Sequence, residues 1–351
     1  MAFMRDEILE QPLALEQLLK EGRLVARDIA RRVNHFRPNF IFIVARGSSD
    51  NAATYARYVF ESYSGLPVSL AAPSLFTLYR RPPNLHKAWV IGVSQSGESE
   101  DIVEVVREGT KQGALTVAIT NNPNSAIAKA ANVVFDLKVG LEKSIAATKT
   151  YTAQLVALAM LAAEVSDDNG LRVGLERVPE AVSNALQLEG EVAELTTHPL
   201  YRDAAHSLVL GRGYNFATAL ELALKLKETS YVFTAPYSSA DFLHGPFALA
   251  EKSLPAVLIG ANGPAIPGLL ELGQRLREHE VEIVTIGDDQ GLLKLATANG
   301  KALPLNLKGI PEALSPIPCI VPGQLLSFHL ALARGQNPDQ PRGLHKITST
   351  I

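Results

Sequence analysis

The chain has 351 residues, of which 47% are hydrophobic and 20% charged, with 25 glycines and 21 prolines. This composition excludes a disordered, collagen-like or coiled-coil chain, and the length allows two ordinary domains or one large one. With 33 basic against 36 acidic side chains the net charge is −3, which disfavours nucleic acid as a main partner.

The amino-terminal segment predicts neither a signal peptide nor a membrane anchor. Arg5, Asp6 and Glu7 interrupt its apolar residues, and we expect no apolar run along the chain that approaches about 18 residues. The single cysteine, Cys319, lies in the apolar run 317–321, which predicts a buried thiol and no internal disulfide. These features predict a cytoplasmic protein without membrane contact.

Two short buried strands are predicted in the first half of the chain. Residues 39–45 and 89–93 are β-branched or aromatic, show no polar alternation, and each run ends in a turn rich in glycine and serine. Helix-period segments are found at 50–62, 100–112 and 153–165. The repeated order of strand, turn and helix predicts a parallel α/β sheet.

The same order returns in the second half of the chain. Predicted strands at 207–210, 256–259 and 282–286 each run into a glycine turn. Ala45 and Ser94, at the turns of the first half, are 49 positions apart, as are Gly211 and Gly260 in the second half. This spacing indicates an internal duplication of an α/β unit, with a sheet of about five strands in each copy.

The predicted fold is α/β, with two tandem domains that are each a doubly wound, mostly parallel sheet flanked by helices. We expect a helical lead-in at residues 1–34, a first domain at 35–170, a second at 171–335 and a carboxyl-terminal tail at 336–351. Open α/β sheets bind ligands beyond the carboxyl ends of their strands, so the turns after the first strands are the places to look.

Two serine-rich turns follow the first two predicted strands. The first reads Gly47-Ser48-Ser49, and the second reads Ser94-Gln95-Ser96-Gly97-Glu98-Ser99. Hydroxyls, close backbone approach at glycine and a helix N-terminus together suit a small phosphate. Neither turn carries the lysine of a P-loop or the dinucleotide glycine fingerprint. The alternative interpretation is that these residues simply cap helices.

A predicted helix at about 215–231 carries Glu221, Lys225 and Glu228 on one face. One interpretation is a structural ion-pair stripe. The other is a carboxylate, poised by burial beside a lysine, that moves a proton between adjacent carbons of a sugar.

Two further residues have a plain interpretation as ordinary polar side chains. His244 lies in the segment 238–246, whose Gly-Pro ending marks a loop, and Lys346 lies in the irregular, proline-containing tail. The spacing of the eight histidines fits no metal-ligand motif, so no metal site is predicted.

Together these segments resemble the sugar isomerase (SIS) superfamily, and most closely the isomerase half of glucosamine-6-phosphate synthases. The resemblance runs almost end to end. It is carried by Glu7-Ile8 and Gln11-Pro12, the two serine turns, Ala146-Ala147-Thr148-Lys149, the segment 219–228, His244-Gly245-Pro246 and Asp339-Gln340-Pro341-Arg342.

The resemblance implies a role for each candidate site residue. Glu228 would move the proton between C1 and C2, His244 would open the sugar ring, and Lys346 would form a Schiff base with the open-chain ketose. In this family the histidine comes from the neighbouring subunit, which implies a homodimer. The implied phosphate ligands are Ser48, Ser49, Ser94, Gln95, Ser96 and Ser99, and the implied sugar contacts are Gly47, Ala146, Ala147 and His345.

The sequence departs from the synthases at two points. The isomerase pattern begins at about Met4 and no cysteine precedes Cys319, so we expect no glutaminase half and no use of glutamine as nitrogen donor. Ala147 stands where the synthases have a sugar-contacting serine. The expected activity is that of stand-alone SIS-type glucosamine-6-phosphate deaminases, which convert glucosamine 6-phosphate and water to fructose 6-phosphate and ammonia without a metal or organic cofactor.

Other activities use the same residues. A fructosamine-phosphate deglycase or an ammonia-dependent synthase would need the same turns and the same carboxylate. A sugar-phosphate-sensing regulator would need the serine turns without Glu228, His244 and Lys346. It would also need a helix-turn-helix domain of about eighty residues before the first strand, where only 38 residues precede Asn39.

Overall fold

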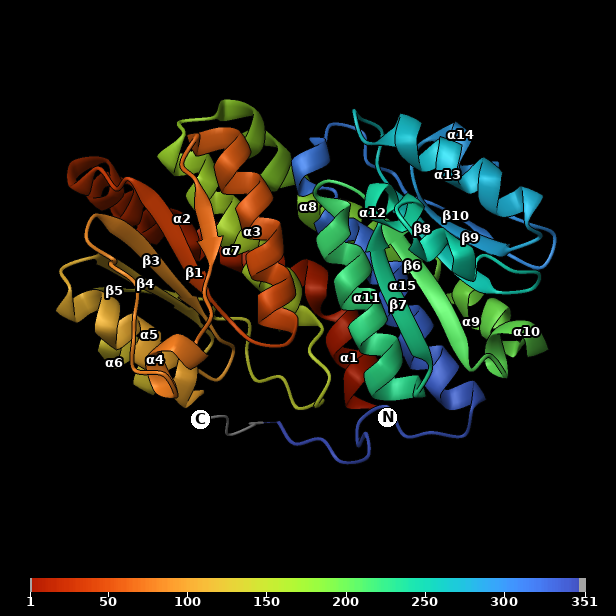
Figure 1. The fold of residues 1–351 in the computed structure, drawn as a ribbon, viewed down its shortest axis with the longest axis horizontal. Coiled ribbons are helices and arrows are strands. Elements are labelled where there is room, and N and C mark those ends of the chain that lie inside the picture. Colours follow the sequence, from red (N-terminus) through yellow and green to blue (C-terminus); the bar gives the residue numbers. More distant parts are fainter. Residues whose placement is uncertain (1, 347–351) are drawn as a thin grey trace. The chain divides into compact units, whose positions relative to one another are not determined.

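The computed structural model of the chain describes residues 2–346, and two five-stranded parallel sheets organise them (Figure 1). The strand order is β2-β1-β3-β4-β5 in the first sheet and β10-β9-β8-β6-β7 in the second. Read from β7, the second sheet repeats the order of the first, with its second strand outside its first and the later strands on the other side. The predicted duplication and the α/β fold class are therefore confirmed.

The first sheet and its helices account for most of the chain up to Val165. Its strands are β1 (Phe40–Val44), β2 (Val68–Leu70), β3 (Ala88–Val93), β4 (Leu115–Thr120) and β5 (Val133–Asp136). The helices are α2 (Gln11–Phe36), α3 (Ser48–Ser64), α4 (Ser74–Thr77), α5 (Glu100–Lys111), α6 (Ala126–Ala130) and α7 (Lys149–Val165).

The second sheet belongs to the later part of the chain. Its strands are β6 (His206–Gly211), β7 (Phe233–Ser238), β8 (Pro255–Gly260), β9 (Glu282–Gly287) and β10 (Ala302–Pro304). The helices are α1 (Phe3–Leu9), α8 (Asn169–Leu186), α9 (Glu189–Thr197), α10 (Pro199–Arg202), α11 (Asn215–Ser230), α12 (Ser239–Leu243), α13 (Ile266–Glu278), α14 (Gln290–Leu293) and α15 (Pro316–Ala333), with short 3₁₀ turns at Pro246–Leu249 and Glu312–Leu314.

The contacts divide the chain into two compact units, each built around one sheet. The first-sheet unit comprises Leu13–Glu142, Lys149–Glu176 and the described tail from Leu344. The second-sheet unit comprises the described residues up to Pro12, then Lys143–Thr148 and Arg177–Gly343. The chain therefore passes between the units several times.

The first sheet is covered on both faces, which explains its continuous apolar strands. Successive residues of a strand point to opposite faces. On one face Trp89 of β3 packs edge-on against Phe60 of α3, with ring centroids 5.1 Å apart. On the other face Val90 joins a buried cluster with Val103 and Val106 of α5. Alternating polar positions would leave polar groups in one of these two cores, so the strands lack them.

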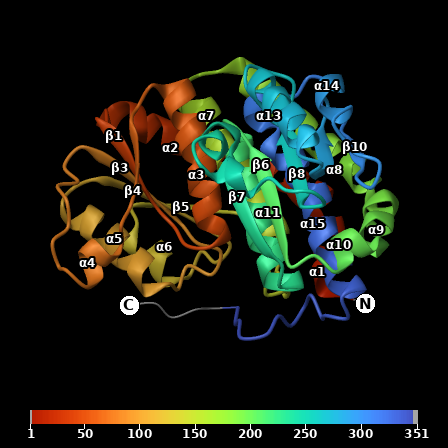
Figure 2. The same cartoon turned by 45° about the vertical axis from the view of Figure 1, so that its right-hand side comes forward.

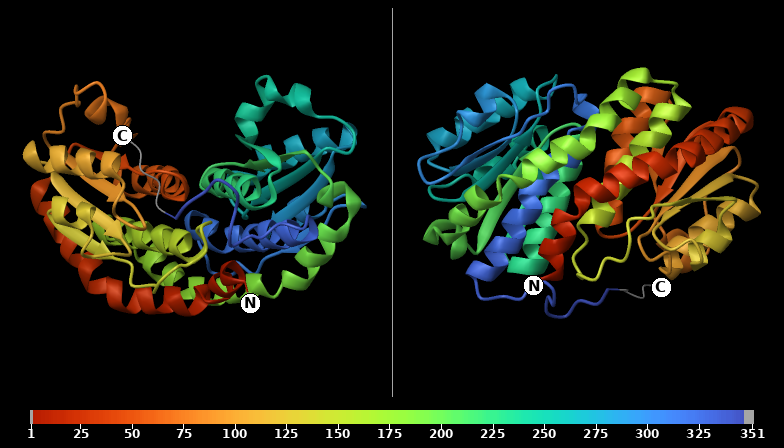
Figure 3. Two further views of the ribbon diagram at one scale, coloured as in Figure 1. Left: turned by 90° about the horizontal axis from the view of Figure 1, so that it is seen from below. Right: turned by 180° about the vertical axis from the view of Figure 1, so that it is seen from behind.

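Helices α11 and α15 pack closely in the second-sheet unit, and α11 also lies beside β6 and β7 (Figure 2). Gly323 of α15 permits the close approach, since a Cβ there would lie 3.0 Å from Leu222 of α11. Helix α1 packs on α15 as well, and the two lie side by side in Figure 3. On β8 and β9, Leu258 and Ile283 belong to a buried cluster that includes residues of α13.

Helix α15 corrects one expectation from the sequence. Its 18 residues carry no Asp, Glu, Lys or Arg, so the expectation that no apolar run approaches about 18 residues is wrong here. The helix is long and apolar enough to cross a membrane, but 83% of the apolar window is buried inside the protein. It is apolar all round because it is a core helix. The Cys319 thiol is fully buried on it, as predicted, and burial raises its pKa.

Element boundaries differ from the sequence predictions in two places. Helix α7 begins at Lys149, four positions before the predicted start. The segment around His244, predicted as a loop, contains the single-turn helix α12 and a 3₁₀ turn from Pro246 to Leu249. Both differences involve short helical turns, whose few residues show little apolar periodicity.

Candidate active site

The first serine turn connects β1 to α3. Gly47 has φ 56° and ψ −133°, a conformation that residues with a Cβ rarely adopt. A Cβ there would meet nothing within 4 Å, so the backbone conformation, and not lack of space, requires glycine. Ser48 then begins α3 and is partly buried. Ser49 is only 8% exposed, and its Oγ accepts a hydrogen bond from Gln154 Nε2 at 2.9 Å.

The second serine turn, after β3, folds back on itself. Ser94 Oγ accepts from the N–H of Gly97 at 3.1 Å, and Ser96 Oγ accepts from the N–H of Glu98 at 3.3 Å. Gly97 has φ 70°, and a Cβ there would collide with the hydroxyl of Ser125. The turn is therefore closely packed and conformationally defined.

Neighbouring elements hold both turns. The Gln95 carbonyl accepts from the Asn121 N–H at 3.1 Å, which ties the second turn to the end of β4. Arg46, next to Gly47, pairs with Asp101 of α5 at 2.8 Å, which ties the first turn to the helix that follows the second. The Asp101 side chain is 2% exposed, whereas Arg46 is half exposed. The ion pair thus presents a partly exposed cation beside the two turns.

The capping interpretation of the serines finds little support. The residues before α3 and α5 are Gly47, which has no side chain, and Ser99, whose side chain makes no capping hydrogen bond in the described structure. A serine that served only as a cap would accept from an N–H in the first turn of its helix. Ser99 is partly buried and follows Glu98, which is exposed.

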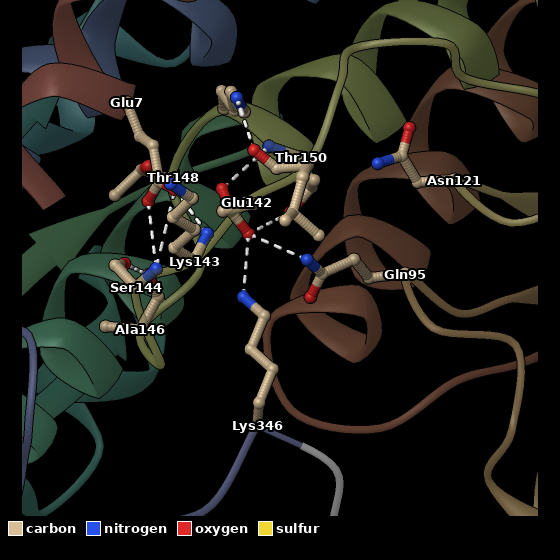
Figure 4. Close-up of polar contacts among 12 residues, drawn as sticks. Glu7, Gln95, Asn121, Glu142, Lys143, Ser144, Ala146, Thr148, Thr150 and Lys346 are labelled. Atoms are coloured by element: carbon tan, nitrogen blue, oxygen red, sulfur yellow. Dashed lines mark hydrogen bonds and ion pairs between the residues drawn. The ribbon is translucent and has the colours of Figure 1, made fainter. Parts of the chain in front are cut away.

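The carboxyl-terminal tail reaches the same unit through Glu142 (Figure 4). Lys346 Nζ lies 3.2 Å from Glu142 Oε2, and Gln95 Nε2 donates to that same oxygen at 3.0 Å. Two predicted site residues, one in the second turn and one in the tail, therefore meet at a carboxylate that the sequence analysis did not single out. His345, next in the tail, is exposed.

The predicted carboxylate lies on α11 in the second-sheet unit. Lys225 Nζ is 2.6 Å from Glu228 Oε2 and 3.5 Å from Glu221 Oε1. The side chains of Lys225 and Glu221 are 1% and 0% exposed, whereas that of Glu228 is 22% exposed. Of the two acids flanking the lysine, Glu228 has the partly exposed side chain, although its Oε2 atom beside Lys225 is buried.

The remaining predicted residues of the second-sheet unit are placed as follows. His244 is exposed, at the end of α12, and the contacts described for Glu228 do not involve it. Ala146 is buried, and its carbonyl accepts from Ser144 Oγ at 2.6 Å. Ala147 is partly buried.

The amino-terminal motif also contacts the loop that carries Ser144 and Ala146. Glu7, which is 4% exposed, accepts hydrogen bonds from the backbone N–H groups of Lys143 and Ser144, the latter at 3.2 Å (Figure 4). The motif around Glu7 was noted as part of a resemblance and was given no physical role. Glu7 follows two other charged residues, Arg5 and Asp6, so the sequence did not mark it as buried.

Comparisons with known proteins agree with this architecture. A family model for the SIS domain matches residues 36–164 and 200–293. A glutamine–fructose-6-phosphate aminotransferase (isomerizing) from Pyrococcus horikoshii is 32% identical over 349 residues, which are 98% of this chain and 57% of that protein. The chain thus spans somewhat more than half the length of this relative.

Two solved structures are similar over nearly their whole length. The C-terminal domain of a glucosamine-fructose-6-phosphate aminotransferase from Francisella tularensis is 31% identical with a TM-score of 0.88, covering 97% of this chain and 98% of that one. A provisionally assigned phosphosugar isomerase from Silicibacter pomeroyi DSS-3 is 33% identical with a TM-score of 0.87, covering 97% and 100%. Within residues 2–346, no group of three or more His, Cys, Asp or Glu side chains is arranged to hold a metal ion.

Proposed function

Because the chain belongs to the SIS domain family, we propose that it binds a hexosamine 6-phosphate and moves a proton between C2 and C1 of the sugar. The proposed reaction converts glucosamine 6-phosphate and water to fructose 6-phosphate and ammonia. The deaminating direction needs water as its second substrate and no delivered nitrogen donor.

The convergence of Gln95 and Lys346 on one oxygen of Glu142 is the observation that carries this proposal. It brings a primary amine, which can react with a sugar carbonyl, to the turn whose hydroxyls suit a phosphate. Amines and phosphate-binding turns are each common, but here a lysine of the tail and a residue of the turn contact the same carboxylate oxygen. A phosphorylated substrate with a carbonyl group accounts for both.

The steps of the proposed reaction balance without a cofactor. His244 assists opening of the sugar ring to the aldehyde, which acidifies the C–H bond at C2. Glu228 takes the proton from C2 and returns it to C1, so that the C1 carbonyl becomes an alcohol and C2 becomes an imine. Lys346 exchanges with ammonia at C2 to form a Schiff base, and water then hydrolyses that bond to give the ketone and the free lysine.

The pairing on α11 supports the role of Glu228. A general base needs a defined position, and the ion pair with Lys225 at 2.6 Å holds the Glu228 carboxylate in place. The Glu228 side chain is partly exposed, with its Oε2 atom buried beside Lys225, while Glu221 is closed to solvent. In this proposal the buried Glu221 and Lys225 support Glu228.

The test is release of ammonium from glucosamine 6-phosphate by the purified chain. We expect Glu228→Gln to lower kcat by about 10²–10⁴-fold, the range for loss of a positioned acid–base group, with binding of the sugar phosphate retained. Hexose-phosphate binding by the wild-type chain without ammonia release or hexose-phosphate interconversion would refute the proposal. Release of an amino acid from fructosamine phosphates instead, or net synthesis from fructose 6-phosphate and ammonia, would assign the alternative reactions.

The same proposal includes a homodimer in which His244 serves the partner's site. A mixture of His244→Ala and Glu228→Gln chains, each inactive alone, should then regain part of the wild-type activity, because one site of each mixed dimer holds both residues. Complete failure of such mixtures, with exchange of subunits verified, would place both residues in the same subunit's site.

A further inference from the structure

A single buried carboxylate receives both the tail and the second serine turn. Glu142 has a side chain that is 0% exposed, and its Oε2 atom accepts from Lys346 Nζ and Gln95 Nε2 (Figure 4). Thr150 supplies two more donors, its hydroxyl to Oε2 at 2.6 Å and its backbone N–H to Oε1 at 3.1 Å. Both oxygens are therefore engaged, and the donors come from three separate parts of the first-sheet unit.

The loop that carries Glu142 is fixed independently of the tail. Three hydrogen bonds hold it: Lys149 Nζ to the Leu141 carbonyl at 2.9 Å, Asn121 Nδ2 to the Gly140 carbonyl at 2.7 Å, and the Val139 N–H to Asn121 Oδ1 at 3.2 Å. Glu142 also accepts a hydrogen bond from the N–H of Thr150, which lies in the first turn of α7, where a negative charge is favoured. The carboxylate therefore has contacts that hold it besides the one with Lys346.

The charge of this site distinguishes Lys346 from the other donors. Gln95 and Thr150 are neutral donors. Lys346 brings a positive charge to a fully buried acid while its own side chain stays 29% exposed. An ion pair with a buried and well-held carboxylate restrains the end of the chain.

We propose that Glu142 is the positioning residue for Lys346. Its carboxylate holds the lysine amine beside Gln95 of the second serine turn and so fixes where the tail can meet a substrate carbonyl. The catalytic consequence rests on the proposed function, whereas the anchoring of the tail does not. Because Gln95 and Lys346 contact the same oxygen atom, a change in either contact is also expected to alter the other.

The anchoring is tested without substrate, by the rate at which acetic anhydride labels each lysine of the full chain, read by mass spectrometry. Lys252, whose side chain is 71% exposed and pairs with Glu280 at the surface, serves as the internal standard. We expect Lys346 to label more slowly than Lys252 in the wild-type chain, because a buried carboxylate holds its amine. In Glu142→Gln, which keeps the shape and loses the charge, we expect the Lys346 rate to rise about tenfold with the Lys252 rate unchanged. Glu16→Gln, at an exposed position of α2, is the matched control and should leave both rates unchanged.

Equal labelling of Lys346 and Lys252 in the wild-type chain would overturn the proposal, and this measurement needs no variant to fold. An unchanged Lys346 rate in folded Glu142→Gln would overturn it as well. In the activity assay, Glu142→Gln and Lys346→Ala should each lower kcat more than they raise KM, and the double variant should be no worse than Lys346→Ala alone. Additive losses would show that Glu142 does not act through the lysine.

The two hypotheses fail in different ways. If the labelling follows expectation but the wild-type chain releases no ammonia, the anchor stands and the proposed function falls. If ammonia is released but Lys346 labels as fast as an exposed lysine, the proposed function stands and the anchor falls.

Discussion

The two halves of the duplicated fold differ in the connections that follow equivalent strands. Strand β1 leads through a serine turn into α3, and β6 leads through Gly211-Arg212-Gly213 into α11, at the same place in the strand order. The first connection leads into Ser48 and Ser49 at the start of α3, whereas the second carries the phenol of Tyr214 and leads into Asn215 and Phe216 at the start of α11. Helix α11 instead buries Glu221 and Lys225, where the corresponding stretch of α3 buries mainly small and aromatic residues.

The other strand ends show the same contrast. After β8, the N–H of Asn262 donates to the carboxylate of Asp288 at 2.7 Å. After β3, the corresponding turn is closed by the hydroxyls of Ser94 and Ser96. A carboxylate at a strand end repels an anionic ligand, whereas hydroxyls can donate to one. At these equivalent strand ends the first sheet carries hydroxyl-bearing residues, whereas the second carries an acid that accepts from a backbone N–H.

The largest effect should come from removing the positive charge of Lys225, which lies beside Glu221 and Glu228 on α11. Lys225→Met removes a cation that is 1% exposed and leaves Glu221 buried without that charge beside it. Loss of one partner of a buried ion pair typically costs about 3–5 kcal/mol, so we expect a loss of that order in urea-unfolding free energy.

Lys227→Met, at an exposed position two residues on, is the matched control and should change stability by less than about 0.5 kcal/mol. Equal stability of the two variants would mean that the second-sheet unit does not depend on its charged stripe, and the contrast between α3 and α11 would lose its basis.

A second effect should appear in binding as well as in stability. Ser94→Ala with Ser96→Ala removes hydroxyls from the turn of the first sheet, and hydrogen bonds to a charged group are worth about 1.5–3 kcal/mol each. We expect affinity for a hexose 6-phosphate, measured by calorimetry, to fall at least about tenfold, while each lost internal hydrogen bond costs about 1 kcal/mol of stability.

Ser207→Ala tests the same substitution in the other half. The Ser207 hydroxyl pairs with that of Thr234 at 2.8 Å in the second sheet, away from any serine turn. It should cost similar stability and leave affinity unchanged. An equal loss of affinity in this variant would show that the serine turns are not special.

The sequence predicted the repeated architecture because two signals, the apolar runs and the spacing of the turns, can be read directly along the chain. The apolar runs of β1 and β3 and the glycines after them depend on neighbouring residues, and the equal spacing of turns revealed the duplication. Five strands were not located: the edge strands β2, β5, β7 and β10, and also β4. Two of them, β2 and β10, have only three residues each. An edge strand is specified mainly by the neighbour it pairs with.

Site residues were predictable to the extent that they fell in one short segment. Ser94 and Gln95 follow a strand directly, so their setting could be read from the chain. Glu142 could not be found in this way, because its significance comes from Lys346, 204 positions away, and from Gln95, 47 positions away. The pairing is a product of tertiary structure, and a lone acidic residue before a helix gives no sign of it.

A smaller effect is expected at the end of the second sheet. Asp288→Asn keeps an oxygen for the Asn262 N–H and removes the charge, so the hydrogen bond weakens by about 1 kcal/mol. We expect a loss of that order in unfolding free energy and an unchanged affinity for the sugar phosphate, because the proposed phosphate ligands belong to the first-sheet unit. A marked fall in affinity would show that this strand end also takes part in binding.

The smallest effect concerns a second acid of the same unit, and its sign depends on pH. Burial raises the pKa of Glu312, although its carboxylate accepts a hydrogen bond from the Ala265 N–H. An acid whose pKa is raised on folding costs stability where it is ionised; the cost is absent below the unfolded pKa of about 4.3 and complete above the folded pKa. Glu312→Gln should therefore unfold at a slightly higher temperature than the wild-type chain at pH 7, with the gain disappearing below about pH 4. Lower stability of the variant at pH 7 would mean that the ionised carboxylate stabilises this end of the sheet. The second-sheet unit would then accommodate its acids by pairing them, without a loss of folding stability.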